Sequence, residues 1–358
     1  MENVVDRWRN RKVFLTGHTG FKGGWLSLWL ASKGAQVRGF SLPPDTEPNL
    51  FTAASLGQVM EDVRGDIRNY AQLQASIHEF APEIVFHLAA QPLVLRSYQD
   101  PLGTYSTNTL GTANVLEAVR KGTSVRAVVC VTTDKCYLNR EWSRPYRETD
   151  HLGGHDPYSS SKACAEIISA AYRSSYFPAE QIAQHGVALA TARAGNVIGG
   201  GDWAEYRLVP DLIRGFQAGT AVSIRRPNAI RPWQHVLEPL HGYIMLAERL
   251  LAQDPVCCSA YNFGPGDDAS WTVAQIANAV ARIWGNGASW IQDGQETEHE
   301  AHSLRLDSSK ARAELGWRPV LGLETALKWT AEWYLACAAG MDMQRKTTEQ
   351  IQRFEGLL

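Results

Sequence analysis

The sequence has few of the features that mark secreted, disulfide-stabilised or membrane proteins. Its six cysteines stand at irregular spacing without a Cys-x-x-Cys pair, which argues against a disulfide framework and a zinc site. The adjacent Cys257 and Cys258 are interpreted as two buried thiols. No apolar run is long enough to cross a membrane, and the charged segment 1–11 lacks the apolar core of a signal peptide. We expect a soluble cytoplasmic protein that holds no metal.

The sequence also lacks strong charge of either sign. Its 358 residues carry a formal net charge of -2, which argues against general binding to nucleic acid or to a membrane surface. Apolar residues make up 44% and charged residues 20% of the chain, as in globular proteins with a large core. Internal repeats and low-complexity tracts are absent as well. A nucleotide recognised by this chain must therefore be held by a local site.

What the sequence does contain is an alternation of short apolar runs and helix-like segments. Strands are expected at 12–16, 36–40, 59–63, 83–88, 125–131 and 186–193. Helices are expected between them at 21–33, 69–80, 104–121 and 158–176. Strands that alternate with helices at this spacing form βαβ units, so the predicted fold class is α/β, a doubly wound parallel sheet of the Rossmann type.

Beyond residue 195 the pattern changes to basic, loop-forming segments mixed with helices at 239–252, 272–283 and 323–338. We therefore predict a cofactor-binding Rossmann domain over 1–195 and a smaller, interleaved α/β substrate domain over 196–358. A segment near 235–265 is expected to return to the first domain, because 261–264 can form a further strand of its sheet.

The first expected strand is followed by Gly17, Gly20 and Gly23, in G-x-x-G-x-x-G spacing. Glycines at a strand-to-helix turn let the backbone approach a pyrophosphate at the helix N-terminus. The motif predicts a dinucleotide site, and a glycine-rich turn without a ligand is the alternative. The second expected strand ends in Ser41, without the carboxylate that usually binds the adenosine ribose and rejects a 2′-phosphate. NAD over NADP is therefore a preference.

Further residues along the sheet edge are candidates for the same cofactor. Asp66, after the third strand, is placed to accept a hydrogen bond from the adenine amino group, and a helix N-terminal cap is the alternative. The fourth strand ends in small residues that let the backbone lie against a cofactor, and His87 before them is interpreted as a packed strand residue. The predicted cofactor-binding residues are Gly17, Thr19, Gly20, Phe21, Lys22, Gly23, Asp66, Ile67, Leu88, Ala89, Ala90, Asn108, Thr132, Tyr158 and Lys162.

Tyr158 and Lys162 form the most chemically specific feature of the chain. At i, i+4 spacing on a helix they lie on one face, with the ammonium near the phenol. A nearby cation favours the phenolate and lowers the pKa of a tyrosine, so we expect Tyr158 to act as a base towards a sugar hydroxyl whose carbon is oxidised.

The strand at 125–131 ends in Thr132, Thr133, Asp134 and Lys135. A dehydrogenase or an epimerase needs only a hydroxyl there, to assist the tyrosine. Removal of water across C5 and C6 of a keto sugar needs an acid and a base, and Asp134 and Lys135 can supply them. Burial is expected to raise the pKa of Asp134, and burial with neighbouring cations to lower that of Lys135. A surface ion pair is the alternative.

Together these segments resemble the nucleotide-sugar branch of the extended short-chain dehydrogenase/reductases, and within it the 4,6-dehydratases. The resemblance runs from about residue 11 to 333 and depends on the segments 17–23, 133–137, 158–162 and 193–203. In the dTDP-glucose dehydratases a Thr-Asp-Glu segment carries elimination. Lys135 in place of that Glu points to the group that acts on CDP-glucose.

The resemblance implies a cycle with NAD as a catalyst. Tyr158 removes the C4 hydroxyl proton with support from Lys162 and Thr133, Lys135 then takes the C5 proton, and Asp134 protonates the departing C6 hydroxyl. The product is a 4-keto-6-deoxy sugar for deoxysugar biosynthesis, as in O-antigen and lipopolysaccharide. Residues at matching positions are expected to bind the nucleotide sugar: Gln91, Asn196, Arg207, Arg225, Arg231 and His235. Arg193 is expected to be structural.

The family further implies a homodimer or a dimer of dimers, through helices near 104–121 and 158–176. His18, Lys22 and Ser41 depart from the pattern of tight NAD binders, so we expect weak cofactor retention. Three alternatives stay open: a dehydratase for another nucleotide hexose, a nucleotide-sugar 4-epimerase, and a non-catalytic NAD-binding regulator. Neither of the last two needs Asp134 and Lys135.

Overall fold

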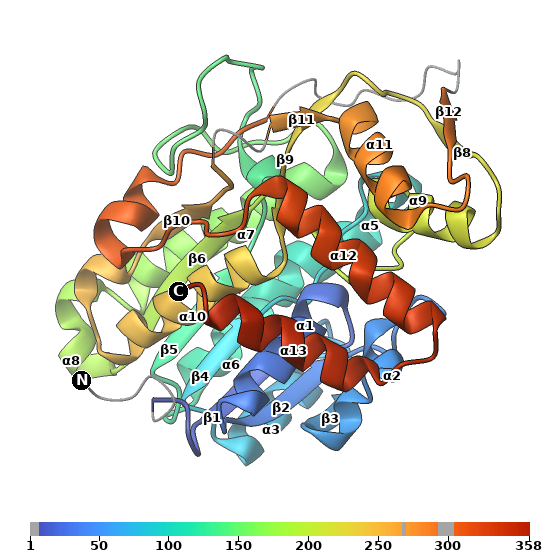
Figure 1. The fold of residues 1–358 in the computed structure, drawn as a ribbon. Helices are drawn as coiled ribbons and strands as arrows, with labels where there is room; N and C mark the ends of the chain where they lie inside the picture. The colour runs from blue at the N-terminus through green and yellow to red at the C-terminus, as the bar shows by residue number, and fades with distance from the viewer. Residues whose placement is uncertain (1–6, 267–269, 293–303) are drawn as a thin grey trace.

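A parallel sheet of seven strands forms the centre of the computed structural model (Figure 1), which describes residues 7–266, 270–292 and 304–358. The strand order is β10-β6-β5-β4-β1-β2-β3, and every neighbouring pair is parallel. The strands are β1 (Lys12–Thr16), β2 (Gln36–Ser41), β3 (Glu61–Arg64), β4 (Ile84–His87), β5 (Ala127–Val131), β6 (Ala188–Ala194) and β10 (Ala260–Phe263). The predicted doubly wound α/β fold is confirmed. Part of the segment considered for a signal peptide, residues 1–6, lies outside the described residues.

The central strands β1, β4 and β5 are almost continuous apolar runs because helices cover both faces of the sheet. In β1, Val13 and Leu15 belong to one hydrophobic cluster, together with side chains of α1 (Phe21–Ser32) and α10 (Leu237–Leu251). Phe14, between them, points to the opposite face and joins a second cluster. The helices that supply that second cluster are α3 (Tyr70–Phe80), α6 (Gly111–Lys121) and α7 (Pro157–Ser175).

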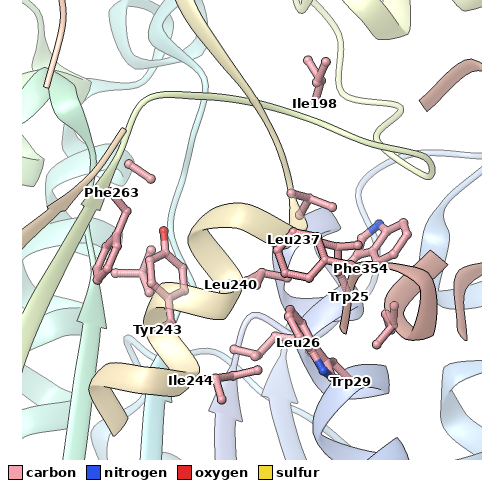
Figure 2. Close-up of a cluster of buried hydrophobic side chains, with 14 of the residues drawn as sticks. Trp25, Leu26, Trp29, Ile198, Leu237, Leu240, Tyr243, Ile244, Phe263 and Phe354 are labelled. Atoms are coloured by element: carbon pink, nitrogen blue, oxygen red, sulfur yellow. The ribbon is translucent and has the colours of Figure 1, made fainter. Parts of the chain in front are cut away.

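Helix α10 occupies the centre of the larger core. Figure 2 shows its apolar side chains between those of α1 on one side and of β10 on the other. The labelled members of this core are Trp25, Leu26, Trp29, Ile198, Leu237, Leu240, Tyr243, Ile244, Phe263 and Phe354. Since α10 and β10 come late in the sequence, the cofactor half of the molecule is completed by segments from beyond residue 195. The division at 195 itself stays a prediction.

The rest of the chain beyond residue 195 forms two small sheets and further helices above the strand ends. One sheet holds β7 (Asn196–Ile198), β9 (Ile230–His235) and β11 (Ser270–Thr272), and the other holds β8 (Val222–Ile224) and β12 (Trp290–Gln292). The helices are α9 (Leu208–Gln217), α11 (Val273–Trp284), α12 (Leu323–Ala338) and α13 (Met343–Glu355). Helix α13 lies along α1, where the Trp29 indole donates to Glu355 over 2.7 Å.

The helix expected at 104–121 is present and runs without a gap from residue 101 to 121, with a π-helical turn inside it that was not predicted. Residues Pro101–Tyr105 form α5, Ser106–Leu110 form a π-helical turn (η3), and α6 follows. The remaining short helices are α2 (Leu50–Ala53), η2 (Leu56–Gln58), α4 (Val94–Gln99), η4 (Asp134–Cys136), η5 (Ala179–Gln181), α8 (Ile182–His185), η6 (Pro255–Cys257) and η8 (Ala311–Leu315). Among the described residues, no helix has the length and apolarity that spanning a bilayer requires.

Candidate active site

A cleft of about 1500 Å³ lies at the carboxyl ends of the sheet strands, below the two small sheets. This is the edge at which doubly wound folds bind their ligands. Of all the residues predicted to form the site, only Asn108 and His235 are absent from its walls. The sheet thus brings together segments that are far apart in the sequence, in particular the end of β5 and the start of α7.

The turn between β1 and α1 requires glycine at two positions. Gly17 has a φ of +81°, and a Cβ there would lie 2.7 Å from the backbone N of Ala89. A Cβ on Gly23 would lie 2.1 Å from the carbonyl O of Gly17. Gly20 is different, because its Cβ would meet only that same oxygen at 3.4 Å. The open space at Gly20, at the N-terminus of α1, fits a cofactor pyrophosphate.

The adenosine end of the cleft is built from hydroxyl groups. The Thr19 Oγ1 lies 2.8 Å from the Ser41 Oγ and donates to the Leu42 carbonyl over 3.0 Å. Further along, the Arg68 side chain donates to both oxygens of Asp66 and lowers the pKa of that carboxyl. Asp66 is not the cap of α3, since that role belongs to Asn69, whose side chain accepts from the backbone N–H of Gln72. Its carboxylate remains a candidate acceptor for the adenine amino group.

His87 is buried beneath the cleft and holds two elements together. Its ring lies between the hydroxyls of Thr16, at 2.8 Å, and Thr112, at 3.0 Å. Burial, with a small contribution from Lys162, lowers its pKa to about 3. The interpretation of His87 as a packed strand residue is confirmed. The backbone N–H groups of Leu88 and Ala89 both donate to Thr16, which fixes the small residues along the cofactor wall.

Asn108 and Gln91 form part of the framework behind the cleft. The side chain of Asn108 accepts from the backbone of Gln91 over 2.8 Å and donates to the Ser161 hydroxyl over 2.9 Å. It is 1% exposed. The side chain of Gln91 is bonded to Leu93 and Thr104 within the protein. Both residues therefore shape the β4 loop, and their contacts with ligands remain predictions.

Tyr158 lies in the cleft at the first turn of α7, next to Thr133. Burial raises its pKa to about 12, although a hydrogen bond with Thr133 lowers it. The expected lowering of this pKa is therefore wrong for the protein alone, because removal of the phenol from water outweighs the hydrogen bond with Thr133 and the charge of Arg207. Lys162 donates from Nζ to the Val131 carbonyl over 3.2 Å, and burial lowers its pKa to about 8.

The acid and the base predicted for elimination lie in the η4 turn directly after β5. Asp134 is 3% exposed and accepts from the Thr133 hydroxyl over 3.0 Å. Burial raises its pKa, as predicted, although Lys135 and Arg231 act in the opposite direction. Lys135 is partly exposed on the cleft wall. A buried carboxyl with a raised pKa is suited to donate a proton, so a simple surface ion pair does not describe this turn.

Basic residues from the second half of the chain face these groups. Arg207 donates to Asp202 over 2.8 Å, and Arg231 is 7% exposed on β9. Asn196 and Arg225 also line the cleft. Guanidinium groups bind the oxygens of a diphosphate well, so these positions fit the predicted role.

His235 does not belong to this set. It is fully buried, and its ring makes edge contacts with the indoles of Trp25 and Trp329. Burial alone lowers its pKa to about 3. The prediction that His235 contacts the nucleotide diphosphate is wrong for this arrangement, because the side chain turns into the core at the end of β9.

Two features of the site were missed at the level of sequence. Burial lowers the pKa of Lys22 to about 8, and the positive charges of Arg207 and Lys162 act in the same direction. Since Lys22 is close enough to feel the charge of Lys162, this lysine of the glycine-rich turn lies near the catalytic region. Glu166, four residues after Lys162 on α7, forms a buried ion pair with Arg193 at 2.8 Å. Glu166 could have been found from the sequence, because it continues the i, i+4 spacing of Tyr158 and Lys162 along one helix face. The expectation that Arg193 is structural is confirmed.

A dinucleotide turn, a buried Tyr/Lys pair and a threonine at one strand end define an enzyme of the short-chain dehydrogenase/reductase class. Within this class, the GDP-mannose 4,6 dehydratase family model matches residues 14–330, and the chain belongs to this family.

Individual relatives agree with this assignment. The CDP-glucose 4,6-dehydratase of Salmonella typhimurium strain LT2 is 52% identical over 95% of this chain and 95% of its own length. The dTDP-glucose 4,6-dehydratase of Xanthomonas campestris pv. campestris strain ATCC 33913 is 27% identical over 90% of this chain and 92% of its own.

Solved structures show the same fold. The UDP-glucose 4-epimerase of Thermotoga maritima with UDP-glucose matches with a TM-score of 0.79 and 22% identity, over 92% of this chain and 99% of its own. DesIV of Streptomyces venezuelae, a dTDP-glucose 4,6-dehydratase with NAD and TYD bound, matches with a TM-score of 0.77 and 20% identity, over 93% and 99%.

Proposed function

We propose that the protein catalyses the NAD-dependent dehydration of CDP-D-glucose to CDP-4-keto-6-deoxy-D-glucose. The observation that carries this proposal is the pair Asp134 and Lys135 in the same cleft as Tyr158 and Lys162. The 52% identity to a CDP-glucose 4,6-dehydratase supports the same reaction and the same sugar nucleotide. An epimerase has no use for an acid and a base at this strand end.

Oxidation at C4 is the first task of the site. Tyr158 takes the proton of the C4 hydroxyl, while Thr133, which is hydrogen-bonded to the phenol, holds that hydroxyl in place. NAD, when bound, accepts the C4 hydride and returns it to C6 at the end of the cycle. The phenol is neutral in the protein alone, and the positive charge of Lys162 favours the phenolate at this step.

Elimination of water is the second task. A ketone at C4 acidifies the C5 proton, and Lys135 removes it and gives a proton back to C5 when the hydride returns to C6. Asp134, whose pKa is raised by burial, gives its proton to the leaving C6 hydroxyl, which departs as water. Arg231, Arg225, Arg207 and Asn196 hold the nucleotide diphosphate.

The walls of the cleft fit NAD along its length. The glycine turn takes the pyrophosphate at Gly20, and the Thr19 and Ser41 hydroxyls meet the adenosine ribose. Without a carboxylate at Ser41 the ribose diol loses its usual pair of hydrogen bonds. We therefore expect the purified protein to carry NAD below stoichiometry, and a full complement measured after purification would contradict this.

Incubation with a panel of nucleotide hexoses and NAD tests the function. We expect a 4-keto-6-deoxy product to form faster from CDP-glucose than from the dTDP, GDP and UDP sugars. A 4-keto product from another nucleotide hexose would reassign the substrate. An epimer with its C6 hydroxyl intact would identify a 4-epimerase, and bound NAD without turnover would identify a regulator.

The proposal includes a homodimer and a place in the cytoplasm, in the deoxysugar biosynthesis that supplies polymers such as O-antigen. Apolar side chains on α5, η3 and α7 support the dimer, because Leu102 is 80%, Leu110 60% and Ile167 55% exposed. Paired with the same face of a second copy, these helices form a four-helix interface. Burial of such a face is a main source of dimer stability.

A further inference from the structure

The segment that carries the elimination residues is held at both ends by one buried ion pair. At its start, the Thr132 hydroxyl donates to the Oε1 of Glu166 over 2.5 Å. At its end, the Tyr137 hydroxyl accepts from the Nη1 of Arg193 over 2.6 Å. Arg193 in turn donates from Nη2 to the Oε2 of Glu166 over 2.8 Å. Thr133, Asp134 and Lys135 thus lie between two anchors on the same pair.

The pair is rigidly placed. Glu166 is 2% and Arg193 3% exposed. Burial acts to raise the pKa of Glu166, but Arg193 and the hydroxyls of Thr132 and Thr191 outweigh it, so the pKa is lowered. Arg193 itself lies on β6, which is paired on both sides, with β10 and with β5. The carboxylate and the guanidinium are therefore both charged and fixed by the core of the fold.

The η4 turn needs such support, because its own hydrogen bonds are long. The N–H of Cys136 donates to the Thr133 carbonyl over 3.4 Å, and the N–H of Tyr137 to the Asp134 carbonyl over 3.5 Å. These lengths lie beyond the normal range for backbone hydrogen bonds. Tyr158 and Lys162, by contrast, stand on a regular helix of 19 residues. The two parts of the active site are thus positioned by different means.

We propose that the Glu166–Arg193 pair is the positioning device for the elimination step, acting through Thr132 and Tyr137 on Asp134 and Lys135. The inference rests on the proposed dehydratase function and deepens it. Neither Glu166 nor Arg193 lines the cleft, so both are positioning residues and not catalytic ones. Loosening of either anchor lets the turn drift from the C5–C6 bond, while the C4 hydroxyl stays against Tyr158.

The test separates the two half-reactions. Oxidation at C4 is followed by nicotinamide absorbance with CDP-6-deoxyglucose, which has no C6 hydroxyl to lose. Elimination is followed with CDP-glucose in heavy water. The quantity measured is the rate at which a 4-keto product with deuterium at C5 is formed. The main variant is Tyr137→Phe, which keeps the ring and removes the anchoring hydroxyl. Arg193→Lys is the second variant, since it keeps a positive charge beside Glu166 and removes the guanidinium nitrogen that donates to Tyr137.

Tyr261→Phe is the matched control. It removes a tyrosine hydroxyl that donates to Glu314 over 2.5 Å, and Tyr261 neither lines the cleft nor shares a hydrogen bond with Glu166 or Arg193. Thermal melting of each variant shows that it is folded.

The expected result is that Tyr137→Phe and Arg193→Lys lower elimination about 10- to 100-fold, as a displacement of the order of 1 Å can. C4 oxidation stays within about twofold of wild type in both variants, and Tyr261→Phe resembles wild type in both assays. Equal losses in both half-reactions, or no loss in elimination for either anchor variant, would overturn the inference. Failure of the wild-type protein to oxidise CDP-6-deoxyglucose or to dehydrate CDP-glucose would instead overturn the proposed function.

Discussion

Lys135 is the residue that separates elimination from oxidation in the proposed mechanism. Replacement by Ala or Met leaves Tyr158, Lys162 and Thr133 in place, so C4 oxidation of CDP-6-deoxyglucose should persist. Loss of the base should lower product formation from CDP-glucose by at least about 100-fold. The decisive measurement is C5–H exchange with solvent deuterium, and exchange at the wild-type rate in Lys135→Ala would show that another group is the base.

Glu238 makes the stability of the fold depend on pH. The carboxyl is 1% exposed, and its Oε1 accepts from the backbone N–H groups of Val320 and Leu321. Burial raises its pKa from 4.5 to about 7, although these two hydrogen bonds act in the opposite direction. An acid whose pKa is raised by folding binds more protons in the folded state, so the free energy of unfolding falls as pH rises from about 4.5 to about 7.

Glu238→Gln should remove this fall in the free energy of unfolding with rising pH. The amide oxygen can still accept both hydrogen bonds, and the side chain no longer titrates. We expect the variant to match wild type near pH 4.5 and to exceed its free energy of unfolding by about 3 kcal/mol above pH 7. Denaturant unfolding at both pH values measures this. Glu349→Gln, on an exposed helix face, is the control and should change little at either pH. A pH-independent difference between Glu238→Gln and wild type would contradict the explanation.

Single residues are also where the sequence was least informative. The spacing of Tyr158 and Lys162 correctly indicated a shared helix face, but it could not indicate how deeply that face is buried, and burial decides the pKa of the phenol. His235 follows a basic loop in the sequence, yet the alternation along β9 turns it between Trp25 and Trp329. Both differences arise from tertiary packing, which local spacing does not encode.

The turn between β1 and α1 allows two glycines to be compared within one element. Gly23→Ala forces a Cβ against the Gly17 carbonyl and should destabilise the protein by about 1–3 kcal/mol, as overpacking does. Gly20→Ala meets open space and should cost only about 0.5 kcal/mol as a poorer helix cap. It should nevertheless weaken NAD binding, because its methyl group occupies the place of the pyrophosphate.

Thermal or denaturant unfolding and titration with NAD separate these two effects. If Gly20→Ala binds NAD as wild type does, the pyrophosphate does not lie over Gly20.

Elements with a strong pattern were predicted well, and interrupted ones were not. The buried run of β5 and the apolar periodicity of α12 are visible in the sequence because packing on both sides demands them. The strand β10 was anticipated from a short apolar run, and it pairs with β6. The π-helical turn η3 was not anticipated, since an inserted residue in a helix leaves no periodic signal. This turn places the Asn108 side chain within hydrogen-bonding distance of Gln91 and Ser161, behind the cleft.

At the scale of the whole molecule, the exposed apolar face of α5, η3 and α7 predicts the assembly. Leu110→Glu and Ile167→Glu place charges in the proposed four-helix interface and should convert a dimer into monomers. Sedimentation velocity measures the change. Met341→Glu is the control, because Met341 is 55% exposed and lies outside that face, in the turn before α13. A wild-type monomer, or dimers that persist in both face variants, would contradict the proposed interface.

The contact of α13 with α1 has a consequence for how the protein is made. The Trp29 indole packs against Phe354 and donates to Glu355, and Lys33 forms an ion pair with the same carboxylate at 2.5 Å. A ribosome delivers α1 long before it delivers α13. Until α13 is made, the Trp29 indole has only its earlier partners, such as His241 of α10, and the part that α13 covers stays exposed. An exposed indole is the kind of surface that chaperones bind. Emergence of α13 ends that exposure, so maturation of the cofactor half is tied to completion of synthesis through residue 355.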